Sequence, residues 1–192
     1  MYASSASNGV TDRLRLFSGR AHGGLAKEIA DRLGVALGSL HVRQFPDTET
    51  KVQIEESVRE ADIFIVQPTC PPVNENLMEL LVILDAFQRA SAGSVTAVVP
   101  YFGYAKQDRK STGREPISAR LVADILTSAG ADRVISVDLH VAQIQGCFAI
   151  PIDHPTALTT TVHALRTTHL DNAAIVSPPV GRVTLADTSA DT

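Results

Sequence analysis

The stretch Val99-Pro-Tyr-Phe-Gly-Tyr-Ala-Lys-Gln-Asp-Arg109 continues an apolar run that begins at Val95. Apolar residues that do not alternate with polar ones are typical of a buried parallel strand. Pro100 and Gly103 end the strand, and aromatic and charged residues follow. In an open α/β sheet, ligands bind at the loops that leave the carboxyl ends of strands. Rings, cations and side-chain amides suit an anionic, aromatic ligand such as a nucleotide; the alternative is a solvated, charged loop.

Apolar runs and helical patterns alternate on both sides of this stretch. We expect strands at 14–17, 39–45, 51–54, 62–67, 95–100 and 133–138, and helices at 24–33, 74–92 and 117–128. Asn74 or Asn76 is expected to cap the second helix. The strands at 39–45 and 51–54 form a β-ribbon with acidic residues at its bend. The pattern predicts an α/β fold whose parallel sheet is covered by helices on both faces.

The composition changes at about residue 151, where weaker patterns begin. We expect a flexible tail at 1–12, one domain at 13–150 and the opening of an incomplete second domain at 151–192. In the latter, a helix is predicted at 157–165, a strand at 173–177 and a further helix at 180–192.

The overall composition is that of a globular protein, with 44% hydrophobic and 20% charged residues. The net charge of −4 argues against a general nucleic-acid or membrane binder, so an anion site has to be a local basic patch. No run is long enough for a membrane span, and the first ten residues have no secretory pattern. The two cysteines, Cys70 and Cys147, are therefore expected to be free thiols in the cytoplasm.

Asp138-Leu-His140 follows the predicted strand at 133–138 and is a candidate metal site. A carboxylate and an imidazole at a strand end can hold Mg²⁺ with the help of a bound phosphate. A hydrogen-bonded structural histidine is the stronger reading of Asp-x-His in isolation. The remaining histidines have no ligand spacing and are expected at the surface or in the core: His22, His41, His154, His163 and His169.

Two further segments have side chains suited to a nucleotide. Phe45 can stack on a base, while Asp47 and Glu49 can accept hydrogen bonds from an amine or from ribose hydroxyls; the alternative is a charged hairpin bend. Ser57 and Arg59 can bind a phosphate, although such a pair is more often simply solvated. There is no Walker-type loop.

Together, these segments resemble the ribose-phosphate pyrophosphokinase family, also called phosphoribosyl pyrophosphate synthetases. The resemblance runs from about Leu14 to about Val183. Its most specific motifs are Asn76-Leu-Met-Glu-Leu-Leu81, Ala97-Val-Val-Pro-Tyr-Phe-Gly-Tyr-Ala105 with Gln107-Asp108-Arg109, and Asp138-Leu-His140 with Gln143-Ile-Gln-Gly146, Phe148 and Pro151-Ile-Asp153.

The resemblance implies a phosphoribosyltransferase-like fold of two similar α/β domains. It implies Mg²⁺-dependent transfer of pyrophosphate from ATP to ribose 5-phosphate, which yields phosphoribosyl pyrophosphate for nucleotide biosynthesis. His140, and more weakly Asp138, match metal contacts, and Ser57 and Arg59 match a regulatory phosphate site. In the family, the ATP pocket is built across a homo-oligomer. The ATP-binding positions are matched by Phe45, Asp47, Thr48, Glu49, Lys106, Gln107 and Asp108.

Several positions depart from the family pattern. Lys106 stands where Arg is frequent, and Lys lacks the bidentate fork. Val141 and Cys147 replace a small or polar residue and an aromatic residue. Pro179 stands where the family has an Asp that contributes to the metal and ribose site, and Pro has no ligand atom in its side chain.

The family's catalytic lysine loop, its ribose 5-phosphate loop and its final segment find no match in the 192 residues. We therefore expect no catalytic residue in this chain, which resembles a C-terminally truncated, ATP-binding N-terminal half that is inactive alone. The ribose 5-phosphate site is expected to be mostly missing. The alternatives are a non-catalytic, nucleotide-binding regulatory subunit and a truncated gene fragment.

Overall fold

The computed structural model describes residues 13–166. The chain divides into two compact units, Met1–His154 and Pro155–Thr192. Of the second unit, the described part contains one helix, α5 (Leu158–Arg166). The strand predicted at 173–177, the helix at 180–192, His169 and Pro179 lie outside the described residues.

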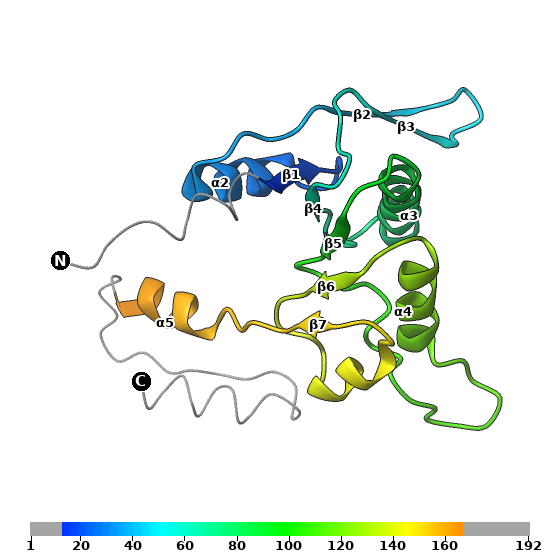
Figure 1. Ribbon diagram of the computed structural model, residues 1–192. Coiled ribbons are helices and arrows are strands. Elements are labelled where there is room, and N and C mark those ends of the chain that lie inside the picture. The colour runs from blue at the N-terminus through cyan, green and yellow to red at the C-terminus, as the bar shows by residue number, and fades with distance from the viewer. Residues whose placement is uncertain (1–12, 167–192) are drawn as a thin grey trace. The chain divides into compact units, whose positions relative to one another are not determined.

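A parallel sheet of five strands forms the centre of the first unit (Figure 1). Parallel pairing and buried apolar side chains agree with the unalternating runs that predicted these strands. Ile65 of β4 pairs with Ala97 of β5, for example, and both are fully buried. In spatial order the strands are β1 (Leu14–Ser18), β4 (Asp62–Val66), β5 (Ser94–Val98), β6 (Arg133–Ile135) and β7 (Ile152–Asp153).

Helices cover both faces of this sheet, as the sequence predicts. Helix α2 (Gly23–Leu33) packs Ala26 and Ala30 into a small cluster with Leu16 and Val66. Helices α3 (Val73–Arg89) and α4 (Ser118–Ser128) lie on the opposite face, beside the β5 and β6 strands in Figure 1. Their buried side chains join the main core with strand residues, among them Leu80, Leu84, Phe87, Val122 and Leu126.

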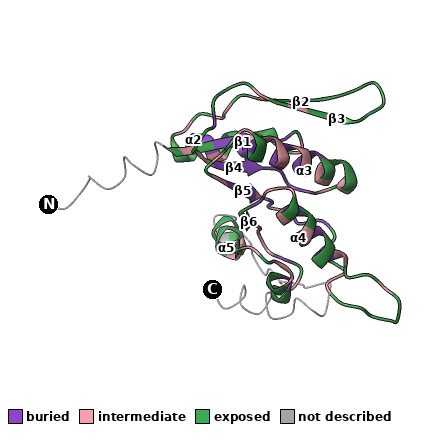
Figure 2. Ribbon diagram, turned by 45° about the vertical axis from the view of Figure 1, so that its right-hand side comes forward, coloured by how far each residue is buried: buried purple, intermediate pink, exposed green. Residues whose placement is uncertain are grey.

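The predicted β-ribbon is present as an antiparallel pair, β2 (Leu40–Gln44) and β3 (Thr50–Ile54). Its residues are partly or fully exposed, and it forms a separate two-stranded sheet that lies alongside α3 (Figure 2). Alternating, half-buried side chains such as Val42 and Val52 pack against the main core, which fixes the register of the pair.

Some elements differ from the expectation. The capping prediction is wrong: α3 begins at Val73 after Pro72, with no side-chain cap, because Asn76 Nδ2 instead donates to the carbonyl of Cys70 at 2.8 Å. Helix α3 ends at Arg89 and β6 ends at Ile135, earlier than predicted. The 3₁₀ helix η1 (Ala142–Cys147) and strand β7 were not predicted. Because β7 pairs with β6, the sheet extends beyond residue 150.

Candidate functional site

The loop that leaves β5 is anchored to the carboxyl ends of the two neighbouring strands. The backbone amide of Val99 donates to the carbonyl of Ile135 at 2.8 Å. On the other side, Thr69 Oγ1 accepts from the amide of Gly103 at 2.7 Å. A Cβ on Gly103 would lie only 2.7 Å from Val73 Cγ1, so the close approach of loop and helix requires glycine. The loop therefore starts from a rigid base.

The predicted ATP-contacting residues of this loop lie just beyond that base. Tyr104 has a φ of 64°, which turns the chain outward. Lys106 is exposed, and Asp108 is half-buried. Gln107 is held on both sides, since its side-chain Oε1 accepts from Ser118 Oγ at 2.7 Å and its carbonyl accepts from the amide of Ala119 at 3.2 Å. The start of α4 thus orients Gln107, while the Lys106 cation faces solvent.

Glu115 closes the far part of the same loop. Its carboxylate accepts from the amides of Thr112 and Ser111, at 3.0 and 2.8 Å, and from Thr112 Oγ1. These hydrogen bonds to the charged form, those from Thr112 first, lower the pKa of Glu115. Glu115 is therefore a structural carboxylate that shapes the loop in its ionised form.

The turn after β6 holds the candidate metal residues. Asp138 has a φ of 46° and is half-buried, whereas His140 is exposed. Between them, Leu139 is buried with only 7% exposure, so its side chain anchors the turn in the core. The Asp-x-His spacing therefore places two polar side chains on either side of an apolar anchor at the carboxyl edge of the sheet.

The loops after β5 and β6 meet through their aromatic side chains and charges. The rings of Phe102 and Phe148 pack with their centroids 5.5 Å apart. Burial raises the pKa of the Cys147 thiol. The positive charge of Arg120 lowers this pKa, and the negative charge of Asp108 raises it. The Phe102–Phe148 contact thus joins the loop after β5 to the segment that follows η1, at one edge of the sheet.

This edge fits Mg²⁺ only as an ion that is bound mostly by other ligands. Within residues 13–166, no group of three or more His, Cys, Asp or Glu side chains could hold a metal ion. Asp138 and His140 can provide at most a carboxylate and an imidazole. Mg²⁺ commonly keeps several waters and binds through one or two carboxylates plus substrate phosphates. The pair therefore suits a magnesium–phosphate complex better than a bare ion.

The hairpin bend carries the other predicted ATP residues. Phe45 donates its amide to the Glu49 carbonyl at 2.8 Å, and Thr48 adopts a φ of 73° in the tight turn. The Phe45 ring is 45% exposed, with Lys51 Nζ 5.7 Å from its centroid. Asp47 and Glu49 are exposed beside the ring. An accessible ring with carboxylates nearby is suited to stacking on a base and accepting hydrogen bonds from it.

The bend does not meet the loop after β5 within one chain. Figures 1 and 2 show the tip of the β2–β3 hairpin and the loop between β5 and α4 at separate ends of the first unit. Thr48 and Glu49 instead line a cavity of about 500 Å³ with Arg20 and with Asn74 and Met78 of α3. Asn74 also accepts a hydrogen bond from the Tyr104 hydroxyl, so this cavity extends toward the start of the loop after β5, while the tips of the hairpin and of that loop lie apart.

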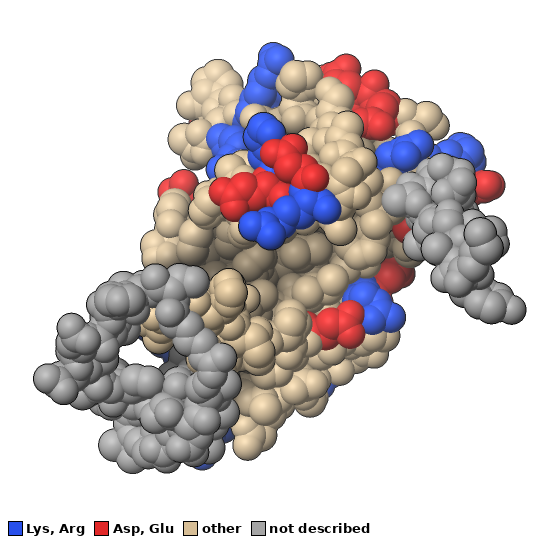
Figure 3. All heavy atoms as spheres, turned by 90° about the vertical axis from the view of Figure 1, so that its left-hand side faces the viewer, with Lys and Arg blue, Asp and Glu red and all other residues tan. Residues whose placement is uncertain are grey.

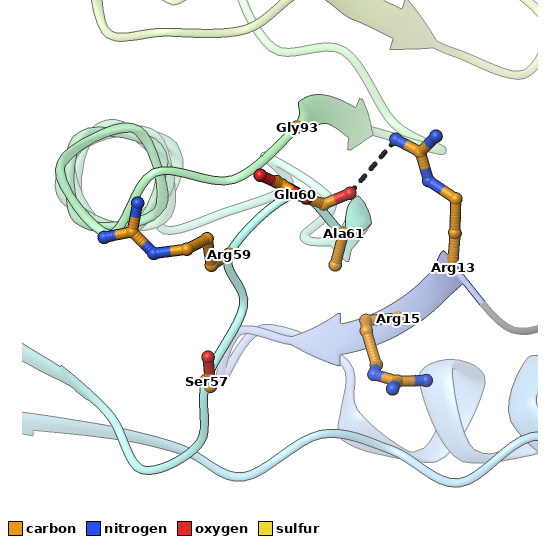
Figure 4. Close-up of a pocket in the computed structure, with 7 residues that line it drawn as sticks. All are labelled: Arg13, Arg15, Ser57, Arg59, Glu60, Ala61 and Gly93. Atoms are coloured by element: carbon orange, nitrogen blue, oxygen red, sulfur yellow. Dashed lines mark hydrogen bonds between the residues drawn. The ribbon is translucent and has the colours of Figure 1, made fainter.

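Ser57 and Arg59, the predicted phosphate residues, line a second cavity of about 460 Å³ (Figure 4). Arg13 and Arg15, from the start of β1, lie on its other side. Arg13 is partly engaged, because its guanidinium donates to the Glu60 carbonyl at 3.0 Å. Three arginines line this cavity together with Glu60, but their guanidinium groups point in different directions, and Arg13 is also paired with Asp62 at 3.4 Å. The cavity lies where the strands begin, at the edge opposite the loops after β5 and β6.

A buried carboxylate, Glu79, organises the carboxyl ends of β1 and β4, and sequence reasoning missed it. It is 2% exposed and accepts from the Arg20 amide at 2.6 Å and from Arg20 Nε at 2.7 Å. Gln67, fully buried at the end of β4, donates its amide to the same carboxylate at 3.2 Å. A charged residue between the apolar positions of α3 was the available signal, since a buried charge needs a partner.

Charged side chains of both signs lie together on the face drawn in Figure 3. This agrees with the small negative net charge. None of the helices between residues 13 and 166 is long and apolar enough to cross a membrane.

Comparison with known proteins identifies the family. Residues 14–130 match the model of the N-terminal domain of ribose phosphate pyrophosphokinase. The chain is 54% identical over 176 residues to "Ribose-phosphate pyrophosphokinase" of Parasynechococcus marenigrum (strain WH8102), covering 92% of this chain and 53% of that protein. It is 52% identical over 181 residues to the protein of the same name from Clostridium perfringens (strain 13 / Type A), covering 93% and 57%.

A solved structure agrees with these relatives. The crystal structure of phosphoribosylpyrophosphate synthetase from Mycobacterium smegmatis superposes with a TM-score of 0.87 at 47% identity, covering 93% of this chain and 60% of that one. The chain thus spans about half the length of the curated relatives it matches. Their names are those of enzymes. By its sequence and its fold, this chain belongs to the ribose-phosphate pyrophosphokinase family.

Proposed function

We propose that this chain binds Mg²⁺–ATP as the pyrophosphate donor of a ribose-phosphate pyrophosphokinase. The observation that carries the proposal is the meeting of two loops at the carboxyl edge of the sheet, through Phe102 and Phe148. One loop bears Lys106, Gln107 and Asp108, and the other bears Asp138 and His140. Binding at this edge is typical of open α/β sheets.

Each side chain has a role that its chemistry suits. Lys106, an exposed cation, neutralises phosphate charge, while Gln107 is held by Ser118 and orients its amide toward the same ligand. His140 and Asp138 contact the magnesium–phosphate complex. When bound, Mg²⁺ supplies charge neutralisation at the phosphates. The reaction, transfer of pyrophosphate to ribose 5-phosphate, then depends mainly on positioning and electrostatics.

The hairpin is proposed to serve a second copy of the chain. Phe45, Asp47, Thr48 and Glu49 are exposed at the bend of the β2–β3 hairpin, whose tip lies away from the tip of the loop between β5 and α4 (Figure 1). In a two-fold dimer, each hairpin can reach the partner's loop, and each site then draws residues from two copies. This is the arrangement that the family resemblance implies.

Mixing two variants with weakened ATP binding tests this arrangement. Phe45→Ala and Lys106→Ala damage different halves of the site. When each copy lends its hairpin to the other, a mixed dimer has one intact site, so about a quarter of all sites in an equal mixture recover ATP binding. If each chain uses its own hairpin, mixing restores no binding, and the shared site is ruled out.

Ser57 and Arg59 are proposed to bind a regulatory phosphate in the cavity of Figure 4, with Arg13 and Arg15 beside them. Arginine pairs well with phosphate because its donors form a planar fork. We place the protein in the cytoplasm, with nucleotide synthesis. The 192 residues alone are expected to bind the donor without turnover, because no ribose 5-phosphate loop was found among them.

Calorimetric titration of the chain with Mg²⁺–ATP tests the main proposal. We expect saturable binding, weakened about tenfold by Lys106→Ala or by His140→Ala, which corresponds to about 1.4 kcal/mol each. Lys27→Ala is a matched control, because Lys27 is an exposed cation on α2. Absence of binding, or binding that neither variant weakens, would refute the proposal.

A further inference from the structure

His154 lies directly after β7, at the same edge of the sheet as the candidate metal residues. The pairing of β6 with β7 sets Ile135 opposite Asp153, and the amide of Ser136 donates to the Asp153 carbonyl at 2.9 Å. The next residue along the chain, just after β7, is His154. The register therefore delivers its imidazole to the turn that follows β6. From its spacing in the sequence, His154 was expected to be an ordinary surface or core histidine.

Both ring nitrogens of His154 face this region. The backbone amide of Leu139 donates to Nε2 at 3.1 Å, and the side-chain amide of Gln145 lies 3.5 Å from Nδ1. Nε2 accepts a hydrogen bond, so in neutral imidazole the proton is on Nδ1. Nδ1–H is then a donor, and it pairs with Gln145 when that amide turns its oxygen to the ring. The imidazole thus links the turn to η1.

Leu139 is the residue between the two candidate metal contacts. Its side chain is buried and its amide is held by His154, so both parts of the residue are fixed. Asp138, immediately before it, adopts a left-handed φ of 46°, a conformation that needs support from its surroundings for a residue other than glycine. Holding Leu139 therefore restrains the backbone from which Asp138 and His140 extend.

We propose that His154 is a positioning residue for the Mg²⁺–ATP site: its Nε2 holds the Leu139 amide and thereby orients Asp138 and His140. The inference rests on the proposed function of that turn. Residues that orient metal contacts affect metal affinity by about 10–100-fold when they are replaced. The role assigned to His154 is to hold Leu139, not to contact the ATP or the metal.

Three substitutions separate this role from simple packing. His154→Phe keeps a ring but has no acceptor, and His154→Gln keeps an acceptor at the same number of bonds from the backbone. His163→Phe is the control, because His163 is exposed on α5. In calorimetric titration of the full chain with Mg²⁺–ATP, we expect His154→Phe to weaken binding about tenfold. His154→Gln should recover most of the loss, and His163→Phe should bind as the wild type does.

A second readout does not depend on ATP. The Leu139 amide should exchange its hydrogen slowly in the wild type and in His154→Gln, and faster in His154→Phe. The nitrogen NMR signals of the His154 ring should report a protonated Nδ1 and an unprotonated Nε2. His154→Leu replaces His154→Phe if the latter does not fold. If the wild type binds no Mg²⁺–ATP, the proposed function fails, whereas Leu139 exchange still decides whether His154 holds the turn.

The inference is overturned by either of two results. The first is an unchanged Leu139 exchange rate in His154→Phe, which would mean that the hydrogen bond does not hold the turn. The second is equal loss of Mg²⁺–ATP affinity in His154→Phe and His154→Gln, which would mean that ring shape and not the acceptor matters.

Discussion

The ring centroids of Phe102 and Phe148 lie 5.5 Å apart, and the two ring planes meet at an angle of 57°. Phe102 belongs to the loop after β5, and Phe148 follows η1, so this tilted pair joins the two loops that carry the candidate ATP residues. Tilted aromatic pairs contribute about 0.5–1.5 kcal/mol beyond the area they bury. The contact makes the relative position of the loops a property of the core and not of the ligand.

Replacing Phe102 with alanine is expected to lower the free energy of unfolding by about 3–5 kcal/mol, because Phe102 is a core residue with 6% exposure. Urea unfolding measures this loss. The control is Tyr101→Ala, since the neighbouring Tyr101 is 47% exposed and its loss should cost about 0.5 kcal/mol or less. Similar losses in the two variants would contradict the packing described for Phe102.

Two glycines of the same loop should respond differently to alanine. A Cβ at Gly103 would lie 2.7 Å from Val73 Cγ1 and 2.8 Å from the Thr69 carbonyl oxygen. Gly103→Ala is therefore expected to reduce the free energy of unfolding by about 1–3 kcal/mol, the usual cost of overpacking. Gly113 has no atom within 4 Å of its Cβ position, so Gly113→Ala should change stability by about 1 kcal/mol or less. Thermal and urea unfolding of both variants test the contrast.

The ion pair between the buried Glu79 carboxylate and the Arg20 guanidinium, whose side chain is 44% exposed, is expected to contribute more than a pair exposed on both sides. Glu79→Ala leaves the Arg20 amide and the Gln67 side chain without their carboxylate, and should cost about 3–5 kcal/mol. A double-mutant cycle with Arg20→Ala should give a coupling energy of about 1–3 kcal/mol.

The exposed pair Lys27–Asp31 is the control for this cycle, and its coupling should be about 0.5 kcal/mol or less. Equal coupling in the two cycles would show that burial adds nothing to the Glu79–Arg20 interaction.

The sequence predicts the sheet well where the pattern is local. Ile63 and Ile65 of β4 lie in an apolar run that is typical of a buried strand, and α3 shows the helical spacing of Leu77, Leu80 and Leu84. Strand β7 is different, because its two residues become a strand only by pairing with β6. No local sequence pattern indicates that these two residues will pair with β6.

The candidate site was predicted as a set of residues but not as a geometry. Motif order does not say that the hairpin tip with Phe45 lies away from the Lys106 loop, since that depends on how the hairpin packs on the rest of the chain. Asn74 was expected to cap α3, yet it accepts a hydrogen bond from the Tyr104 hydroxyl, a partner 30 residues away. The role of His154 is likewise set by Leu139, which is close in space only.

The thiol of Cys147 offers a chemical probe of the same edge. Burial raises its pKa, Asp108 and Asp124 raise it further, and Arg120 lowers it. A raised pKa means less thiolate at a given pH, and the thiolate is the reactive form. In a Cys70→Ser background, alkylation of Cys147 by iodoacetamide is therefore expected to reach its half-maximal rate at a higher pH than alkylation of a free cysteine peptide.

Charge substitutions then report which side chains surround the thiol. Asp108→Asn removes a negative charge, so it should lower the pKa of Cys147 and speed alkylation at a fixed, mildly alkaline pH. Arg120→Gln removes a positive charge and should slow the reaction. Asp31→Asn, on α2, should leave the rate unchanged. Because Asp108 belongs to the loop after β5 and Cys147 to η1, an unchanged rate in Asp108→Asn would contradict an effect of the Asp108 charge on this thiol.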